Sequence, residues 1–274
     1  MAALATGKEH ISYSESKDWN ECSWRHNVKY VKKIKLDPDK PHLDFGTAFH
    51  GVIEEVILDR NITNGKEIAK TILEASFEKN KDSEFYQNID IDEWATRIAD
   101  ELVPEALELL DNEIPGWTVD CSEEQLYEPI TILGESRHSD VNIKGMIDAV
   151  LCQNVKGKKI WWLIDWKTAN KSWGKAKLMD KNVTSQLAIY KQTWAAKHKV
   201  PLSQIRCAFV VVVKDGKKGK RAKFHKVSVG PTSTAKSLKV INNMVWAIKN
   251  GIAIKVKNEN TCRFCPYKNT EWCT

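Results

Sequence analysis

Residues 143–167 read IKGMIDAVLCQNVKGKKIWWLIDWK, and this stretch decides the fold. Two runs rich in aliphatic and aromatic residues, 143–152 and 160–166, lie on either side of the tetrapeptide Val-Lys-Gly-Lys at 155–158. Short apolar runs that flank a glycine-containing turn are typical of an antiparallel hairpin. The sequence therefore predicts two paired strands joined by a tight turn.

The expected register of this hairpin brings two carboxylates together. If the turn is centred between Lys156 and Gly157, Asp148 and Asp165 are equally far from it and face each other. Alternation puts Lys167 on the same face, whereas the side chains at 162, 164 and 166 point into a core. Opposed acids destabilise a sheet unless a cation lies between them. A divalent metal ion would supply that charge, and Lys167 would neutralise a developing oxyanion.

The alternative is a cross-strand salt bridge between Asp148 and Lys167 on a solvated face. An isolated Asp-x-Lys element is more often structural in this way. Both acids here follow strongly apolar strand residues, where an ion without a role is costly. This position favours a functional site.

The elements around the hairpin predict an α/β fold. Apolar periodicity predicts four helices before it, the last with a kink or break at Pro104. A strand precedes the hairpin, and a helix, two strands and a final helix follow it, so the order is helix-rich and then βββαββα. The expected helices cover 14–30, 45–58, 67–78, 92–110, 181–198 and 232–250, and the further strands cover 126–133, 205–213 and 223–229.

Composition limits the class of protein. The chain has 274 residues, of which 42% are hydrophobic and 28% are charged, as expected of a folded globular domain. The N-terminus lacks a basic start followed by an apolar run, and the longest apolar stretch, 207–213, is too short to cross a bilayer. We therefore expect a cytoplasmic protein with no membrane association.

Charge is segregated along the chain. Residues 84–128 contain fourteen acids and one base, whereas residues 214–226 contain seven bases and one acid. Such segregation gives one face that attracts phosphates and another that repels them. A solvated acidic helix beside a lysine-rich hairpin that keeps the protein soluble explains the same pattern equally well.

Seven cysteines, an odd number in a chain without an export signal, favour metal ligation over disulfides. Those at 121, 152 and 207 lie singly in apolar or strand-like surroundings, as expected of buried thiols. Cys262, Cys265 and Cys273 instead lie together in the last thirteen residues.

Two helical pairs add polar groups. Gln186 and Tyr190 are four residues apart and project from one helical face, where they would contact a shared ligand. His50 follows Gly46 by four residues, and the glycine allows another element to approach closely. Each pair alone is weak evidence, because a lone helical histidine is usually a structural hydrogen-bonding group.

The order of these motifs resembles the PD-(D/E)XK nuclease superfamily in its RecB-like branch. The resemblance implies a restriction-endonuclease-like core, in which a mixed central sheet is flanked by helices. It also implies a single domain over 1–274, with a helical part to about residue 120, a nuclease core to about residue 250 and a cysteine segment at the end. The motifs are Gly46-Thr-Ala-Phe-His50, Gly145-Met-Ile-Asp148, Asp165-Trp-Lys167-Thr168 and Gln186-Leu-Ala-Ile-Tyr190.

The resemblance implies a deoxyribonuclease that hydrolyses phosphodiesters with a metal-activated water, acting as an exonuclease on single-stranded DNA or DNA ends. His50, Asp148 and Asp165 would bind Mg or Mn, with Asp148, Asp165 and Lys167 as the catalytic residues. Gln186 and Tyr190 would support substrate binding.

The cysteines extend the resemblance. RecB-like nucleases of the CRISPR-associated adaptation group and related types hold a 4Fe-4S cluster with one cysteine before the histidine motif and three at the C-terminus. Cys22, Cys262, Cys265 and Cys273 look like that set. Seven residues separate Cys265 from Cys273, a longer spacing than expected, so tetrahedral zinc is the alternative. Such a site would pin the first helix to the end of the chain.

No phosphate-loop motif accompanies the nuclease motifs, which points to free-standing members such as the CRISPR adaptation nucleases and their phage-encoded relatives. The resemblance implies a bacterial, archaeal or virus-infected cell as the host. Recombination, replication or CRISPR adaptation proteins are then the expected partners, and assembly into a homo-oligomer stays open. Lys171 and Lys175 would follow the DNA backbone. Trp173 would stack on an unpaired base or, as the alternative, anchor a loop.

Two other functions use the same residues differently. A catalytically silent DNA-binding or assembly subunit would keep the scaffold, although it has no need of two opposed acids near phosphates. A zinc-stabilised module that recognises nucleic acid or protein would carry zinc and no iron.

Overall fold

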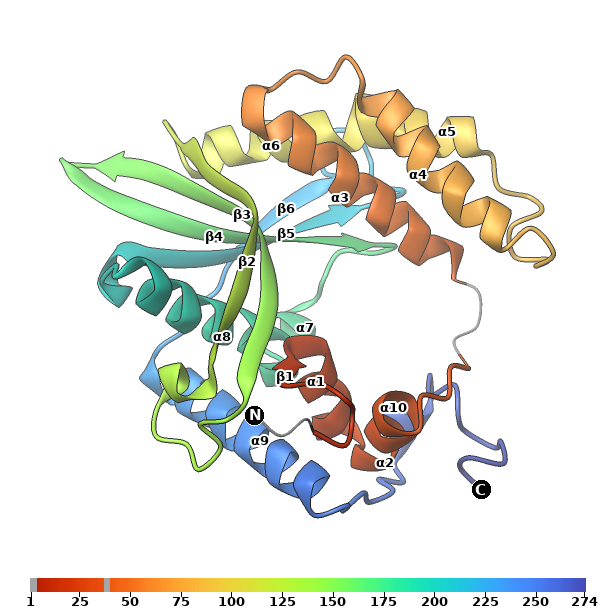
Figure 1. Ribbon diagram of the computed structural model, residues 1–274. Helices are drawn as coiled ribbons and strands as arrows, with labels where there is room; N and C mark the ends of the chain where they lie inside the picture. Colours follow the sequence, from red (N-terminus) through yellow and green to blue (C-terminus); the bar gives the residue numbers. More distant parts are fainter. Residues whose placement is uncertain (1–3, 37–39) are drawn as a thin grey trace.

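The computed structural model describes residues 4–36 and 40–274, and six of their strands form one mixed sheet (Figure 1). The order is β1-β3-β4-β5-β6, with β2 also paired to β3. The pairs β1–β3 and β4–β5 are parallel, and the other pairs are antiparallel. The strands are β1 His10–Ser12, β2 Thr118–Pro129, β3 Asn142–Val155, β4 Lys158–Ala169, β5 Ile205–Val213 and β6 Ala222–Lys226.

The predicted hairpin is confirmed as β3 and β4. Ala149 pairs with Ile164 and Val155 pairs with Lys158, the expected register. The turn residues Lys156 and Gly157 have φ values of 52° and 80°. Two consecutive left-handed residues match the right-handed twist of the flanking strands, and this turn fixes the pairing.

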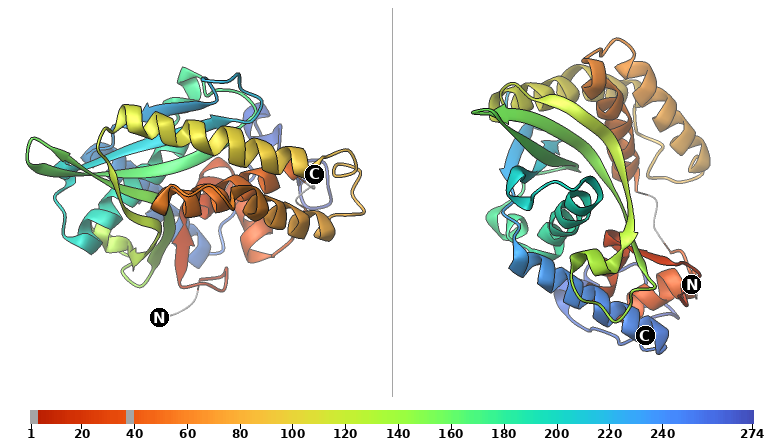
Figure 2. Two further views of the ribbon diagram at one scale, coloured as in Figure 1. Left: turned by 90° about the horizontal axis from the view of Figure 1, so that it is seen from above. Right: turned by 60° about the vertical axis from the view of Figure 1, so that its left-hand side comes forward.

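Helices cover both faces of the sheet (Figures 1 and 2). The face that presents Trp162, Ile164 and Trp166 packs against α3, α4, α5 and α6, as the predicted alternation requires. The opposite face packs against α8 and α9. These helices are α3 Pro41–Asp59, α4 Gly65–Lys79, α5 Ile91–Thr96, α6 Val103–Glu113, α8 Lys181–His198 and α9 Pro231–Lys249; the shorter ones are α1 Tyr13–Glu21, α2 Ser23–His26, α7 Lys175–Leu178 and α10 Glu259–Cys262. The α/β fold with a mixed central sheet flanked by helices is thus confirmed.

Several boundaries differ from the prediction. The expected helix over 14–30 is broken at Cys22, which has extended backbone, and it continues as α2 and a π-helical turn. The expected strand over 126–133 begins earlier, at Thr118, and gives way to a 3-10 turn after Pro129. The short parallel strand β1 was not predicted, because three residues carry no periodicity. The irregularity expected at Pro104 is a π-helical turn that ends where α6 begins.

The segregated charges pair with each other. Arg97 contacts Asp215 at 2.5 Å, and Arg221 of the basic hairpin contacts Glu105 at 2.6 Å and Glu101 at 2.8 Å. Part of the positive charge expected to attract DNA is therefore neutralised by the acidic helical segment.

None of the helices in the described residues is long and apolar enough to span a membrane.

Candidate active site

The two hairpin carboxylates lie where β3 and β4 separate. Asp148 accepts a hydrogen bond at Oδ2 from the backbone N–H of Trp166 at 2.7 Å, in place of a strand-to-strand bond. The Asp165 side chain is 1% exposed, and its Oδ2 contacts Lys167 Nζ. The structure thus brings together the three residues predicted to carry catalysis.

Helix α3 places His50 over this pair. A Cβ on Gly46 would lie 2.9 Å from Thr168 Oγ1, so the glycine allows α3 to approach β4 closely, as predicted. One turn later, His50 Nδ1 lies 3.8 Å from Asp148 Oδ2 and 3.5 Å from Glu54 Oε1. Glu54 was not predicted, although its position four residues after His50 is a usable signal.

A second acid that the sequence did not single out is Glu123 on β2. Its backbone has φ 53°, a strained conformation for glutamate, and it falls between the β2–β3 pairs Ser122–Ala149 and Glu124–Ile147. Ser122 Oγ donates to Glu54 O at 3.3 Å, so α3 lies beside this part of β2, and the negative charge of Glu54 raises the pKa of Glu123. The Glu-Glu dipeptide gave no hint of this, because the contact arises from tertiary packing.

The acids give the site an excess of negative charge. Burial and the charge of Asp165 raise the pKa of Asp148 to about 7. Burial alone lowers the pKa of His50, but the hydrogen bond to Glu54 and the charges of Asp148 and Glu54 outweigh it and raise that pKa. Both shifts hold protons on groups that would otherwise lose them, as expected where a cation is needed.

Helix α8 brings Gln186 and Tyr190 to the same region. Gln186 Nε2 lies 3.4 Å from Tyr190 Oη, and both side chains are buried. A Cβ on Gly145 would lie 2.6 Å from the Tyr190 ring, so the glycine three residues before Asp148 makes room for the tyrosine. Burial, followed by the charges of Asp165 and Asp148, raises the pKa of Tyr190 to about 12.

The loop after β4 forms an open cavity of about 460 Å³ beside the site. Lys171 and Trp173 line it, together with Lys177 and Lys214, whereas exposed Lys175 lies outside the lining. Trp173 packs on Phe209 with ring centroids 5.4 Å apart, and Lys177 Nζ lies 4.5 Å from its ring centre. This packing agrees with the alternative interpretation of Trp173, in which the side chain anchors a loop.

The cysteines at the two ends of the chain come into the same region. Cys22 caps α2 by accepting from Arg25 N–H at 3.5 Å, and Cys262 Sγ donates to Val256 O at 3.6 Å. Burial, together with the neighbouring Cys273 and Cys22, raises the pKa of Cys265. Of the remaining cysteines, Cys207 is buried as expected, and those at 121 and 152 are half-buried.

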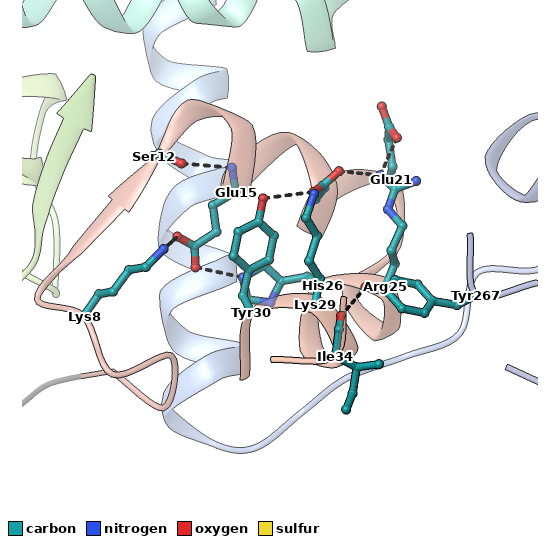
Figure 3. A network of polar contacts seen from close by, with 11 residues as sticks. Lys8, Ser12, Glu15, Glu21, Arg25, His26, Lys29, Tyr30, Ile34 and Tyr267 are labelled. Atoms are coloured by element: carbon teal, nitrogen blue, oxygen red, sulfur yellow. Dashed lines mark hydrogen bonds and ion pairs between the residues drawn. The ribbon is translucent and has the colours of Figure 1, made fainter. Parts of the chain in front are cut away.

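Contacts outside the cysteines also join the two ends (Figure 3). Tyr267 Oη donates to Ile34 O at 2.6 Å, and Trp24 Nε1 donates to Trp272 O at 2.7 Å. Arg25 pairs with Glu21 at 2.6 Å, which orients the segment that follows Cys22 (Figure 3). The first helices and the last residues thus form one packed unit.

Neither the acidic site nor the cysteines form a complete metal site in this structure. Residues 4–36 and 40–274 contain no group of three or more His, Cys, Asp or Glu side chains that could hold an ion. The donor chemistry nevertheless fits. Asp165 Oδ2 is buried and has no hydrogen bond of normal geometry among these residues, although it contacts Lys167. Carboxylates with one imidazole suit Mg or Mn, and thiols suit iron-sulfur or zinc.

Comparison with known proteins agrees with this geometry. The sequence pattern of the PD-(D/E)XK nuclease superfamily matches residues 10–273. The fold of this chain is similar to the solved structure of a candidate exonuclease from Eubacterium rectale. The TM-score is 0.57 at 12% identity, and the match covers 96% of this chain and 89% of that one. No curated protein is significantly similar in sequence.

Proposed function

Because the chain belongs to the PD-(D/E)XK nuclease superfamily, we propose that it is a metal-dependent deoxyribonuclease of the RecB-like branch that acts as an exonuclease on single-stranded DNA or DNA ends. The family implies a nucleic-acid substrate. The observation that carries the proposal is the meeting of Asp148, Asp165 and Lys167 where two strands separate, with His50 above them.

His50, Asp148 and Asp165 would hold the metal ion, Mg or Mn. When bound at such a site, an ion of this kind lowers the pKa of a water molecule and polarises the phosphate to be cleaved. An imidazole among the ligands suits Mn at least as well as Mg. The raised pKa values of Asp148 and His50 support a cation at this position.

The side chains around these ligands have roles of their own. Lys167, held by Asp165, stabilises the negative charge that develops on the phosphate. Glu54 accepts from the His50 ring and orients it, while the Trp166 N–H fixes one oxygen of Asp148. These fixed contacts prepare the site before substrate arrives.

The DNA strand would run across the cavity after β4. Lys171 lines this cavity and Lys175 is exposed beside it, where both can meet backbone phosphates. Trp173 also lines this cavity, where it would stack on an unpaired base, and Gln186 with Tyr190 would support the nucleotide next to the reacting phosphate.

A 4Fe-4S cluster would be held by Cys22, Cys262, Cys265 and Cys273, with tetrahedral zinc as the alternative. The packing of the two chain ends supports this assignment: Cys22 Sγ donates to Ile254 O at 3.8 Å, and Trp24 Nε1 donates to Trp272 O next to Cys273. The role of the cluster is structural, because it would close a loop of nearly the whole chain.

The test is cleavage of end-labelled single-stranded and duplex DNA by anaerobically purified protein in Mg, Mn or chelator. Lys167→Ala is compared with Lys159→Ala, an exposed lysine at the far end of the same strand. Metal-dependent cleavage that is lost only in Lys167→Ala is expected, and the product ladder gives the polarity. Equal inactivity of all three proteins with intact DNA binding would make the chain a binding or assembly subunit.

A further inference from the structure

A second cavity lies between α1, α8 and α9, outside the candidate active site. Its volume is about 240 Å³, below the roughly 300–1,000 Å³ of sites for drug-sized ligands. The floor is apolar, with Ile189 and Val240, and the walls carry hydroxyl and amide groups, among them Ser16, Asn20 and Thr232. This combination suits a small polar group with a short apolar part.

Three lysines line this cavity, and no carboxylate does: Lys17 from α1, Lys181 from α8 and Lys236 from α9. Among the residues that the structure describes, none of the three has an ion-pair partner, so each ammonium group is available to a ligand. Lys181 is the first residue of α8, where the helix dipole disfavours a cation. An anion in the cavity would be attracted by three ammonium groups, with no carboxylate in the lining to repel it.

The cavity is connected to the active site by short links. Tyr13 of α1 donates its hydroxyl to Asn182 O in the cavity wall, and the charge of Asp165 contributes, after burial, to raising the pKa of this tyrosine. Helix α8 also borders both places, because Asn182 and Ser185 line the cavity and Gln186 with Tyr190 lies at the candidate active site.

We propose that the cavity of Lys17, Lys181 and Lys236 binds an internal phosphate of the nucleic-acid strand, one or more nucleotides away from the phosphate that is cleaved. Lysine ammonium groups and hydroxyls are the usual partners of backbone phosphates, and such contacts position a strand without reading its sequence. A sugar-phosphate unit combines an anion with an apolar ring edge, which matches the walls and floor. The assignment rests on the proposed nuclease function for its ligand class.

The two cavities would then hold one strand at two points, with the reacting phosphate between them. After each cleavage the longer product would stay bound through the second cavity, which favours stepwise digestion over release. Short oligonucleotides that reach only the active site would not bind at the second cavity.

The test measures binding of a fluorescent oligothymidylate of about twenty nucleotides in chelator, where cleavage does not interfere. Lys17→Ala/Lys236→Ala is compared with Lys159→Ala/Lys239→Ala, which removes the same charge from exposed positions outside the cavity. The cavity variant is expected to bind about tenfold more weakly at low salt, with a log–log salt slope smaller by about 0.7 for each phosphate that the variant no longer binds. Its melting temperature should not fall, because only unpaired like charges are removed.

The outcomes separate this proposal from the nuclease assignment. If the cavity and control variants have the same affinity and the same salt slope, the proposed phosphate site is overturned, whereas metal-dependent cleavage is left intact. Weaker binding by the cavity variant in a protein that cleaves nothing would support the cavity and refute the nuclease. If the cavity variant loses affinity only for strands that carry a terminal phosphate, and not for strands that end in hydroxyls, the cavity binds strand ends. That result would overturn the proposed contact with an internal phosphate.

Discussion

Replacing Asp148 with asparagine should stabilise the metal-free protein, and more so at alkaline pH. Burial and the charge of Asp165 raise the pKa of Asp148 from its ordinary 3.8 to about 7. A carboxyl with a higher pKa in the folded chain holds its proton better there, so stability falls as the pH rises from about 4 to about 7. Asparagine keeps an oxygen for the Trp166 N–H and carries no charge.

The magnitude follows from the pKa difference of about three. At pH 8 the folded state disfavours the Asp148 carboxylate by about 4 kcal/mol, because each pKa step corresponds to 1.36 kcal/mol. At pH 5 most of the folded protein keeps the proton, and only about 1.5 kcal/mol of this penalty applies. The gain from Asp148→Asn should therefore be about 2–3 kcal/mol larger at pH 8 than at pH 5.

Urea unfolding in chelator at the two pH values measures this difference. Glu108→Gln, on the exposed face of α6, is the control, since a solvated charge contributes little to stability. Added Mn should stabilise the wild type at pH 8 but not Asp148→Asn, because a ligand is lost. If Asp148→Asn changed the free energy of unfolding equally at both pH values, the argument that the site contains unbalanced negative charge would be refuted.

Three further substitutions test other parts of the structure. Lys167→Ala should lower the cleavage rate by about 10²–10³ while DNA binding persists, as gel shifts in chelator would show. Gly145→Ala should cost about 1–3 kcal/mol in urea unfolding, because its Cβ would meet the Tyr190 ring at 2.6 Å; an unchanged midpoint contradicts this. Cys22→Ser should lose iron, or zinc if that is the metal, in elemental analysis, while Cys152→Ser keeps it; equal metal contents would rule out Cys22 as a ligand.

The hairpin and its facing carboxylates were predictable because the turn is local. A Lys-Gly turn with two left-handed residues fixes the pairing, and strand alternation then places Asp148, Asp165 and Lys167 on one face. Gly46 was informative for a similar reason, since a missing side chain four residues before His50 signals a close approach.

The features that the sequence did not reveal depend on contacts between distant segments. The break at Cys22 follows no propensity signal, since its thiol caps α2 and its neighbour Ser23 bonds to Ile254, 231 residues away. Glu54 and Glu123 meet because α3 crosses the β2–β3 pair, and neither position is unusual in sequence. The pairing of the basic hairpin with α6 was likewise hidden, because charge counts do not say which segments become neighbours.

The candidate active site lies where the central sheet opens at one point. The pairing of β3 with β4 ends at Ala149 and Ile164, and beyond it the Asp148 side chain takes the N–H of Trp166 that a strand would have used. Tyr190 packs against Gly145 just before this opening, while β4 continues along β5. A carboxylate that replaces a ladder hydrogen bond is held in place through one oxygen, and among the described residues the second oxygen has no hydrogen bond, so it can bind a cation. Gly46 and Gly145 thus let α3 and α8 approach the two strands beside the opening, and Asp148 and Asp165 lie at it.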